Sequence, residues 1–535
     1  MKNHSLLAVA IFLTISGFSQ QTRFYSDPEE KFKEAKEYFQ KEQYSLAYPL
    51  FRELQHDIRE TDKANTAITV QEIKYYTLVC ALKQNEGRAE EEAQEFINLQ
   101  KNNARVQMMN FHLGEYYFRN EKFADAIQQY DQANIENLSN REIADMKFHQ
   151  GYSYFNLQNF AKAKPLFNSI RSMKDDPNYM DANYYYGFLA FRDKQYGDAL
   201  ESFKIVENEK NYGTVVPYYI AQIYYIQGKK DEAINYIQQK LASGSSAQYY
   251  DLELKQLIGH AYFEKGEYAK ALPYLEDYVG RSKKVRREDL YELSYCYYNQ
   301  NNLAKAIEGF KQLSGNEDSL SQHAMYLLGD AYLRTGQKSN ARNAFLFCSS
   351  NSSNAEQKEI AKYQYAKLSY ELGYQDEAIN SLSSFLTDYP NSKYTVEAKE
   401  LMIDMLAKTN NFKDAQAMLE SLDKPSENAK KLYPRILYGR ATEMINDGRM
   451  ADANELLDKV LADPNNTVVR PLAYFWKGEI GYRNNQLDTA IKYFQLYVTA
   501  GSPTSGEANA TNVRYNLGYA YLRKENYPVS LTIIE

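Results

Sequence analysis

Residues 148–167 read FHQGYSYFNLQNFAKAKPLF, and the features of this stretch recur along almost the whole chain. Side chains three or four residues apart lie on one face of a helix. Gly151 and Tyr154 therefore mark a stripe on one helix, and Ala163 and Phe167 mark a stripe on the next. The polar residues NLQN between them favour a tight turn. The stretch predicts two antiparallel helices, with the glycine and the alanine small because the two backbones come closest there.

An alanine equivalent to Ala163 returns every 33 to 40 residues, after one longer first step. An apolar residue follows the alanine by four positions, and a small residue nearly always precedes it by twelve. The alanines are Ala47, Ala93, Ala126, Ala163, Ala199, Ala233, Ala271, Ala306, Ala341, Ala378, Ala415, Ala453 and Ala490, followed by Ser530 where another alanine is due. The glycines at the small position are Gly114, Gly151, Gly187, Gly259, Gly329, Gly478 and Gly518. A single hairpin of this kind cannot bury its apolar face, so the repeats are expected to stack into one solenoid.

The repeat resembles the tetratricopeptide repeat (TPR), a helical hairpin with a Leu-Gly-x-x-Tyr core and a later Ala-x-x-x-Phe. One copy is formed by Leu113, Gly114, Tyr117, Ala126 and Tyr130. Further matches are Leu328, Gly329, Tyr332, Ala341 and Phe345, and then Leu517, Gly518 and Tyr521. The leading tryptophan of the family pattern is absent from every copy. The resemblance implies an all-α, right-handed superhelical α-solenoid of about 14 antiparallel helical hairpins over residues 26–535, the last one incomplete.

A second resemblance lies in residues 385–398, FLTDYPNSKYTVEA, which are similar to TPR units of bacterial cell-envelope proteins such as the lipoprotein of the outer-membrane barrel assembly machine. Pro390 follows Ala378 by twelve residues, where a second helix should end. Ser392 is expected to cap the helix that follows.

The N-terminus has the pattern of a signal peptide. Lys2 supplies a positive charge, residues 6–18 form an apolar run, and small residues stand near position 19. The run of 13 residues is shorter than the ~20 that a membrane-spanning helix needs. We therefore expect a signal peptide at 1–19, a short extension at 20–25, export to the periplasm, and no integral membrane segment. No cysteine follows the run, which argues against a lipid anchor.

The C-terminus predicts an interrupted repeat. The last copy stops inside its second helix, and its final residues, Val529 to Ile534, are too apolar for a capping repeat. We expect Glu535 to end a fragment, so one open alternative is that the repeats recruit partners for a catalytic domain beyond it.

Composition and motifs argue against chemistry within these 535 residues. The formal net charge is −7 with mixed signs, which does not favour nucleic acid as a partner. Zinc, nucleophile-elbow, phosphate-loop and dinucleotide motifs are all absent from the sequence. The three cysteines, Cys80, Cys296 and Cys348, are expected to be small buried residues. We predict no catalytic residue, no cofactor and no metal site, and hence no enzyme.

Tyrosine is unusually abundant, at 50 of 535 residues, and suggests a binding surface. Aromatic residues recur at i, i+4 and i+7 on several first helices. The candidate partner-binding residues are Phe148, Tyr152, Phe155, Tyr184, Phe188, Phe191, Tyr291, Tyr295 and Tyr298. The TPR resemblance implies that first helices line a concave groove, where exposed rings would bind a protein or peptide, or alternatively a glycan such as peptidoglycan. The competing interpretation is that the rings pack one repeat on the next.

Overall fold

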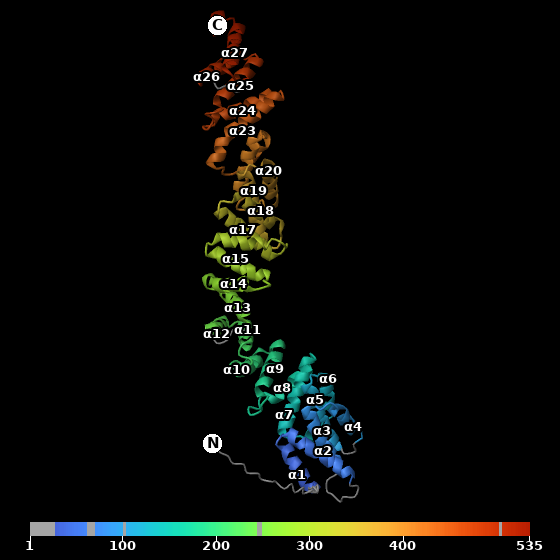
Figure 1. Cartoon of the computed structure of the whole chain (residues 1–535). Helices are drawn as coiled ribbons and strands as arrows, with labels where there is room; N and C mark the ends of the chain where they lie inside the picture. The colour runs from blue at the N-terminus through green and yellow to red at the C-terminus, as the bar shows by residue number, and fades with distance from the viewer. Residues whose placement is uncertain (1–26, 61–69, 100–102, 243–248, 502–505, 535) are drawn as a thin grey trace, which may run out of the picture. The chain divides into compact units, whose positions relative to one another are not determined.

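The computed structural model describes residues 27–60, 70–99, 103–242, 249–501 and 506–534. These ranges contain 28 α-helices, one short 3-10 helix and no strand (Figure 1). The predicted all-α architecture of antiparallel helical hairpins is confirmed. The signal peptide expected at 1–19, the extension at 20–25 and Glu535 lie outside the described residues.

The chain divides into two compact units, residues 1–251 and 252–535. The hairpins of the first unit are α1 (Pro28–Gln40) with α2 (Tyr44–Glu60), α3 (Val70–Gln84) with α4 (Ala89–Leu99), α5 (Asn103–Arg119) with α6 (Phe123–Gln132), α7 (Asn140–Asn156) with α8 (Phe160–Ile170), α9 (Tyr179–Arg192) with α10 (Tyr196–Val206), and α11 (Val216–Ile226) with α12 (Lys230–Ala242). The 3-10 helix η1 (Ile135–Asn137) lies between α6 and α7.

The hairpins of the second unit begin with α13, whose first residue is the last residue of the first unit. They are α13 (Asp251–Glu264) with α14 (Tyr268–Arg281), α15 (Arg287–Asn299) with α16 (Leu303–Lys311), α17 (Ser319–Arg334) with α18 (Lys338–Ser350), α19 (Ala355–Glu371) with α20 (Gln375–Asp388), α21 (Thr395–Lys408) with α22 (Phe412–Glu420), α23 (Glu427–Asn446) with α24 (Met450–Ala462), α25 (Arg470–Arg483) with α26 (Leu487–Thr499), and α27 (Ala510–Arg523) with α28 (Tyr527–Ile534).

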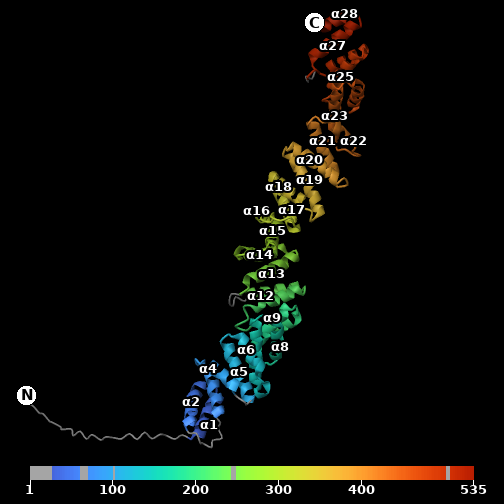
Figure 2. The same cartoon turned by 90° about the vertical axis from the view of Figure 1, so that its right-hand side faces the viewer.

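Within each unit the hairpins stack in chain order (Figures 1 and 2). Within a unit, second helices contact the first helix of their own hairpin and the first helix of the next, as α18 contacts α17 and α19. First helices also contact one another directly, as α5 does with α7 and α17 with α19. The first helices therefore form one layer of the stack, and the second helices form the other.

The repeat residues lie where each hairpin closes. All thirteen repeat alanines are completely buried. A Cβ added at Gly478 would lie 2.6 Å from the ring of Phe494, and one at Gly329 would lie 2.7 Å from the ring of Phe345. The glycine thus makes room for the side chain sixteen residues later. This corrects the expectation that close approach of two backbones is what keeps the glycine small.

The turn inside each hairpin has a common conformation. Each of the fourteen turns contains one residue with φ between 56° and 80°, the left-handed region. In thirteen of them this residue stands five positions before the repeat alanine or its equivalent, Ser530. Five of the fourteen are glycine, which adopts this conformation without steric cost. The exception is Asn85, eight positions before Ala93, because the turn between α3 and α4 is longer.

Two local expectations were wrong. In α4 the buried apolar residue is Phe96, whereas Ile97, four positions after Ala93, is half-buried. Ser392 does not cap α21, which begins at Thr395 with Tyr394 at the capping position. The Ser392 hydroxyl instead accepts a 3.2 Å hydrogen bond from the Tyr394 backbone N–H and stabilises the turn before the helix.

Replacing Gly478 by alanine tests the contact between glycine and ring. The new Cβ would overlap the Phe494 ring, so we expect the variant to lose about 1–3 kcal/mol of unfolding free energy. Adding Phe494→Leu should recover part of the loss. Gly280→Ala is the matched control, because a Cβ there meets nothing within 4 Å. Urea unfolding followed by circular dichroism measures the effect; equal midpoints for the two glycine variants would contradict the packing model.

The three cysteines offer a test of burial. Cys80, Cys296 and Cys348 are buried free thiols, and burial raises the pKa of each to about 12. Since the thiolate is the reactive form, we expect none of them to react with a thiol reagent at pH 8 within minutes. All three should react in concentrated urea. Rapid modification of any thiol in the native protein would show that its helix is not packed as described.

Candidate functional site

The nine aromatic residues predicted to bind a partner lie on α7, α9 and α15, at the same positions of each helix. Counted from the small residue of each first helix, Gly151, Gly187 or Ser294, they occupy positions −3, +1 and +4. Phe148 is buried, at 7 % exposure, and the other eight are half-buried. Each of these eight rings therefore keeps part of its surface in solvent.

In the first unit the rings pack between successive first helices. Tyr152 of α7 meets Tyr185 of α9 edge-on at a centroid distance of 5.3 Å. Phe155 meets Phe188 at 5.7 Å, and Phe188 in turn meets Tyr219 of α11 at 6.0 Å. The rings form a continuous row across α7, α9 and α11. One side of each ring holds the next hairpin, and the remaining surface is available to solvent.

Two further stripe residues of the first unit, Tyr184 and Phe191, also pack against neighbouring rings. Tyr184 stacks on Tyr212, which precedes α11, at 4.2 Å. Phe191 lies 5.3 Å from Tyr219 and 5.9 Å from Tyr196. Both therefore belong to the same packed row.

In the second unit the stripe of α15 contacts hairpins on both sides. Tyr291 and Tyr295 lie 6.4 and 5.5 Å from the ring of Phe263 on α13. The Tyr298 hydroxyl donates to Asp330 of α17 at 2.5 Å. Burial, together with this carboxylate, raises the pKa of Tyr298 to about 12. This part of the surface is therefore more polar than the row on α7, α9 and α11.

Polar pairs occupy the same layer, and sequence reasoning missed them. At several places within a unit the residue at +1 of one first helix contacts the residue at −2 of the next. We call these contacts junction pairs. Three of them are polar: Glu115 with His149 at 2.7 Å, His260 with Glu292 at 2.5 Å, and Glu479 with Asn516 at 2.8 Å. Aligning the repeats on their small residues would have found them, because both members keep a fixed offset from that residue.

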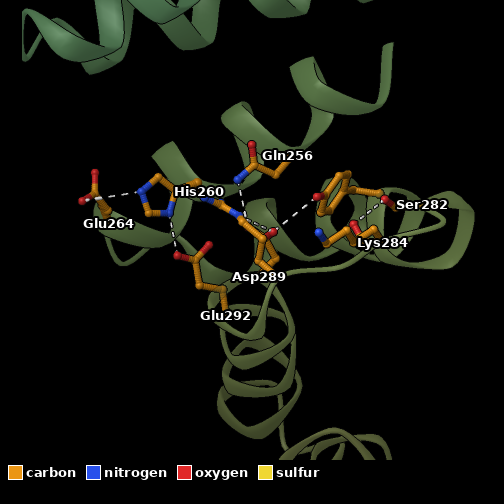
Figure 3. Close-up of polar contacts among 9 residues, drawn as sticks. Gln256, His260, Glu264, Ser282, Lys284, Asp289 and Glu292 are labelled. Carbon is orange, nitrogen blue, oxygen red and sulfur yellow. Dashed lines mark hydrogen bonds and ion pairs between the residues drawn. The ribbon is translucent and has the colours of Figure 1, made fainter. Parts of the chain in front are cut away.

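The junction between α13 and α15 contains the most extensive polar network (Figure 3). His260 lies between Glu292 on α15 and Glu264 on its own helix, 3.8 Å away. Beside it, Asp289 is completely buried. Gln256 donates to Oδ1 of Asp289 at 2.8 Å, and the Arg286 guanidinium donates to both of its carboxylate oxygens at 2.7 and 2.9 Å.

The network determines the pKa values of its members. Burial raises the pKa of Asp289, but the hydrogen bonds from Arg286 and Gln256 outweigh it, so the pKa ends below the ordinary value. The pKa of His260 is raised, chiefly by its hydrogen bond to Glu292. Both pKa shifts favour the charged forms, and the hydrogen bonds of Asp289 to Gln256 and of His260 to Glu292 join α13 to α15.

The pKa of His112 is shifted in the direction opposite to that of His260. It is buried in α5, and its Nε2 lies 3.1 Å from the Tyr75 hydroxyl of α3. Burial lowers the pKa of His112 to about 3, so this imidazole is neutral at physiological pH. Burial likewise lowers the pKa of His323, whose Nδ1 pairs with the amide of Gln357.

Across the described ranges, no three His, Cys, Asp or Glu side chains come together as a metal site would require. No helix of those ranges is both long enough and apolar enough to cross a membrane.

Comparison with known proteins assigns the repeat. A family model described as tetratricopeptide repeat matches residues 148–212 and 438–505, which include the aromatic row on α7 and α9 and the hairpin of Gly478. The chain is a tetratricopeptide-repeat solenoid. A second model, the YfiO outer membrane lipoprotein family, matches residues 259–412 of the TPR chain. This match contains the stretch 385–398 and confirms its resemblance to cell-envelope TPR units.

Solved structures with similar hairpins share little sequence with the TPR chain. YrrB, described as a TPR protein with an unusual peptide-binding site, is 15 % identical; the match covers 37 % of this chain and 97 % of YrrB, with a TM-score of 0.30. The C-terminal part of a TPR repeat-containing protein from Cytophaga hutchinsonii is 14 % identical over 54 % of this chain and 98 % of that one, with a TM-score of 0.30. The Naa15/Naa10 complex bound to HypK-THB is 14 % identical over 87 % and 75 %, with a TM-score of 0.33. TM-scores of this size assign no function, and no curated protein matches the chain.

Asp289→Asn tests the polar junction. The amide keeps the shape of the side chain but replaces a charged acceptor with a donor that faces Arg286, so we expect a loss of roughly 1–3 kcal/mol. The contribution of Asp289 is present above its unfolded pKa of about 3.9 and is lost as pH falls through its lowered folded pKa. The variant should therefore differ most from wild type at pH 5–7 and least near pH 2. Glu288→Gln, an exposed neighbour, is the control; equal urea midpoints for both variants would contradict the assigned role.

Proposed function

We propose that the TPR chain is a non-enzymatic, exported scaffold that binds a partner protein or peptide through the layer of its first helices. The observation that carries this proposal is the row of half-buried rings on α7, α9 and α11, which extends over three consecutive hairpins. A partner that covers the remaining ring surface would gain apolar burial from side chains that are already ordered.

The energetics of aromatic anchors support this choice. Tyrosine and phenylalanine bring large contact areas with few rotatable bonds, and such residues dominate the binding energy of many interfaces. In this row each ring is fixed by its neighbours, as Phe188 is by Phe155 and Tyr219. Binding therefore costs little side-chain entropy.

Export to the periplasm is supported by two separate observations. The N-terminal pattern around Lys2 and residues 6–18 is that of a signal peptide. The match of residues 259–412 is to a family of outer membrane lipoproteins. Cell fractionation and sequencing of the mature N-terminus would test export; a start at Met1 in the cytoplasmic fraction would refute it.

The binding proposal is tested with leucine substitutions in the stripe. Tyr152→Leu, Phe188→Leu and Tyr295→Leu, combined in one variant, keep apolar packing between hairpins but remove the solvent-facing ring edges. The control variant replaces exposed apolar residues of second helices, Leu46, Leu346 and Val498, with serine. Each protein serves as bait for cell-envelope extract, and binding of each captured protein is then measured with purified components.

We expect at least one purified partner to bind wild type and the control equally, and to bind the stripe variant at least about tenfold more weakly, as loss of aromatic anchors predicts. Equal urea midpoints of wild type and the stripe variant ensure that folding is intact. If the stripe variant and the control variant bind every purified partner with equal affinity, the stripe is excluded as the binding surface. A different result would indicate glycan binding in place of protein binding. In that case no protein partner is found, the wild-type chain is retained on insoluble peptidoglycan, and the stripe variant is not.

A further inference from the structure

Two of the polar junction pairs join a histidine to a carboxylate, and they do so in opposite directions. Between α5 and α7 the carboxylate, Glu115, stands at +1 and the histidine, His149, at −2. Between α13 and α15 the histidine, His260, stands at +1 and the carboxylate, Glu292, at −2. Both pairs therefore place a titratable imidazole at the contact between two stacked hairpins.

The α5–α7 pair is enclosed on several sides. The Glu115 side chain is 9 % exposed and also accepts a 2.7 Å hydrogen bond from the Tyr130 hydroxyl of α6. The ring of Phe118 stacks on His149 at 3.9 Å. The Lys83 ammonium of α3 acts on the same carboxylate from a greater distance. Burial raises the pKa of Glu115, but the hydrogen bonds from His149 and Tyr130 outweigh it, and the pKa ends below its ordinary value.

In the α13–α15 pair the carboxylate of Glu292 is buried and has fewer hydrogen-bond partners than that of Glu115. The Glu292 side chain is 8 % exposed, and its Oε2 has no hydrogen-bond partner within the part of the chain that the structure describes. A buried carboxylate without a cationic partner is costly. The groups that face His260 include Glu292 and Asp289 from α15 and Glu264 from α13, while Arg286 offsets Asp289. The surroundings of His260 are therefore acidic and favour the imidazolium.

We propose that the α13–α15 junction makes the stacking of these two TPR hairpins sensitive to pH, with protonated His260 holding α15 on α13 and the neutral imidazole loosening the contact. The third polar junction, Glu479 with Asn516, has an amide in place of the imidazole and cannot respond in the same way.

The direction of the pH effect follows from the pKa shift of His260 at one junction and that of Glu115 at the other. The pKa of His260 is raised, so its contribution is complete below the unfolded histidine value of about 6.5 and is lost as pH rises through the folded value. The pKa of Glu115 is lowered, so its contribution is complete above about 4.3 and is lost as pH falls through the folded value. The α13–α15 junction is therefore tightest below about pH 6.5 and weakens toward alkaline pH, whereas the α5–α7 junction loses the Glu115 contribution in acid.

Such a device would act on the surface proposed to bind a partner. On α15, Glu292 follows Tyr291 directly, and both stand on the helix that carries Tyr295. The pH inference itself does not depend on the proposed function, since it concerns contacts within the chain.

Hydrogen–deuterium exchange of the full chain tests the inference. Exchange is measured between pH 5.5 and 8.5 and corrected for intrinsic rates, with peptides from α15 compared with peptides from α27. We expect protection of α15 to fall several-fold more over this range than protection of α27. The variant His260→Gln keeps a hydrogen-bond donor at this site and should abolish the excess pH dependence.

An equal pH dependence of the two helices, or an unchanged dependence in the glutamine variant, would overturn the proposal. If the variant does not fold, the proposal is tested instead by following the NMR titration of ¹³C-labelled histidines in the wild-type chain. Titration of His260 between pH 6.5 and 8.5, coincident with loss of protection in α15, supports the device. A His260 that titrates below pH 6 refutes it.

Discussion

The contact between the glycine of a first helix and the side chain sixteen residues later closes seven of the fourteen described hairpins, and the stacking of these hairpins depends on it. At Gly329 and Gly478 the ring occupies the place where a Cβ would stand. A larger residue there would separate the two helices, and a smaller side chain opposite would leave a cavity. Because the pair is repeated, its geometry sets the angle at which every hairpin presents its first helix to the next.

The layer of first helices follows from that arrangement. Once a hairpin is closed, positions −2 and +1 of successive first helices face each other, and the chain fills them with different chemistries. Tyr152 and Tyr185 meet ring to ring, whereas Glu479 and Asn516 meet through a hydrogen bond. Stacking energy in a solenoid is roughly a sum over neighbouring repeats. The residues at each junction can therefore be apolar, neutral and polar, or ionisable without a change of fold. The chemistry of this layer can vary from repeat to repeat while the stacking of the hairpins is kept.

The sequence predicted the architecture well because the signal is repeated. A single glycine or alanine says little, but Ala163 and its twelve equivalents share one spacing, and all are completely buried. The repeat also allows the turn conformation to be predicted, because the left-handed turn residue stands five positions before the alanine in nearly every repeat. Failures occurred where a local contact overrides the pattern. The longer turn at Asn85 shifts burial from Ile97 to Phe96.

The candidate site was harder to predict, for a physical reason. An aromatic stripe at helical spacing is compatible with core and with surface. In α7 and α9 every stripe ring except the buried Phe148 serves both, because it packs on neighbouring rings and stays partly exposed. Sequence periodicity gives the direction of a side chain on its own helix but not the distance of the neighbouring helix, and that distance decides how much of the ring is covered. The junction pairs were missed for a related reason: Glu115 and His149 are 34 residues apart, and their contact exists only because two hairpins stack in a particular register. A surface built in this way couples binding to stacking. Any ligand that covers the rings also bears on the contacts between hairpins, and any change in those contacts alters the surface that the ligand meets.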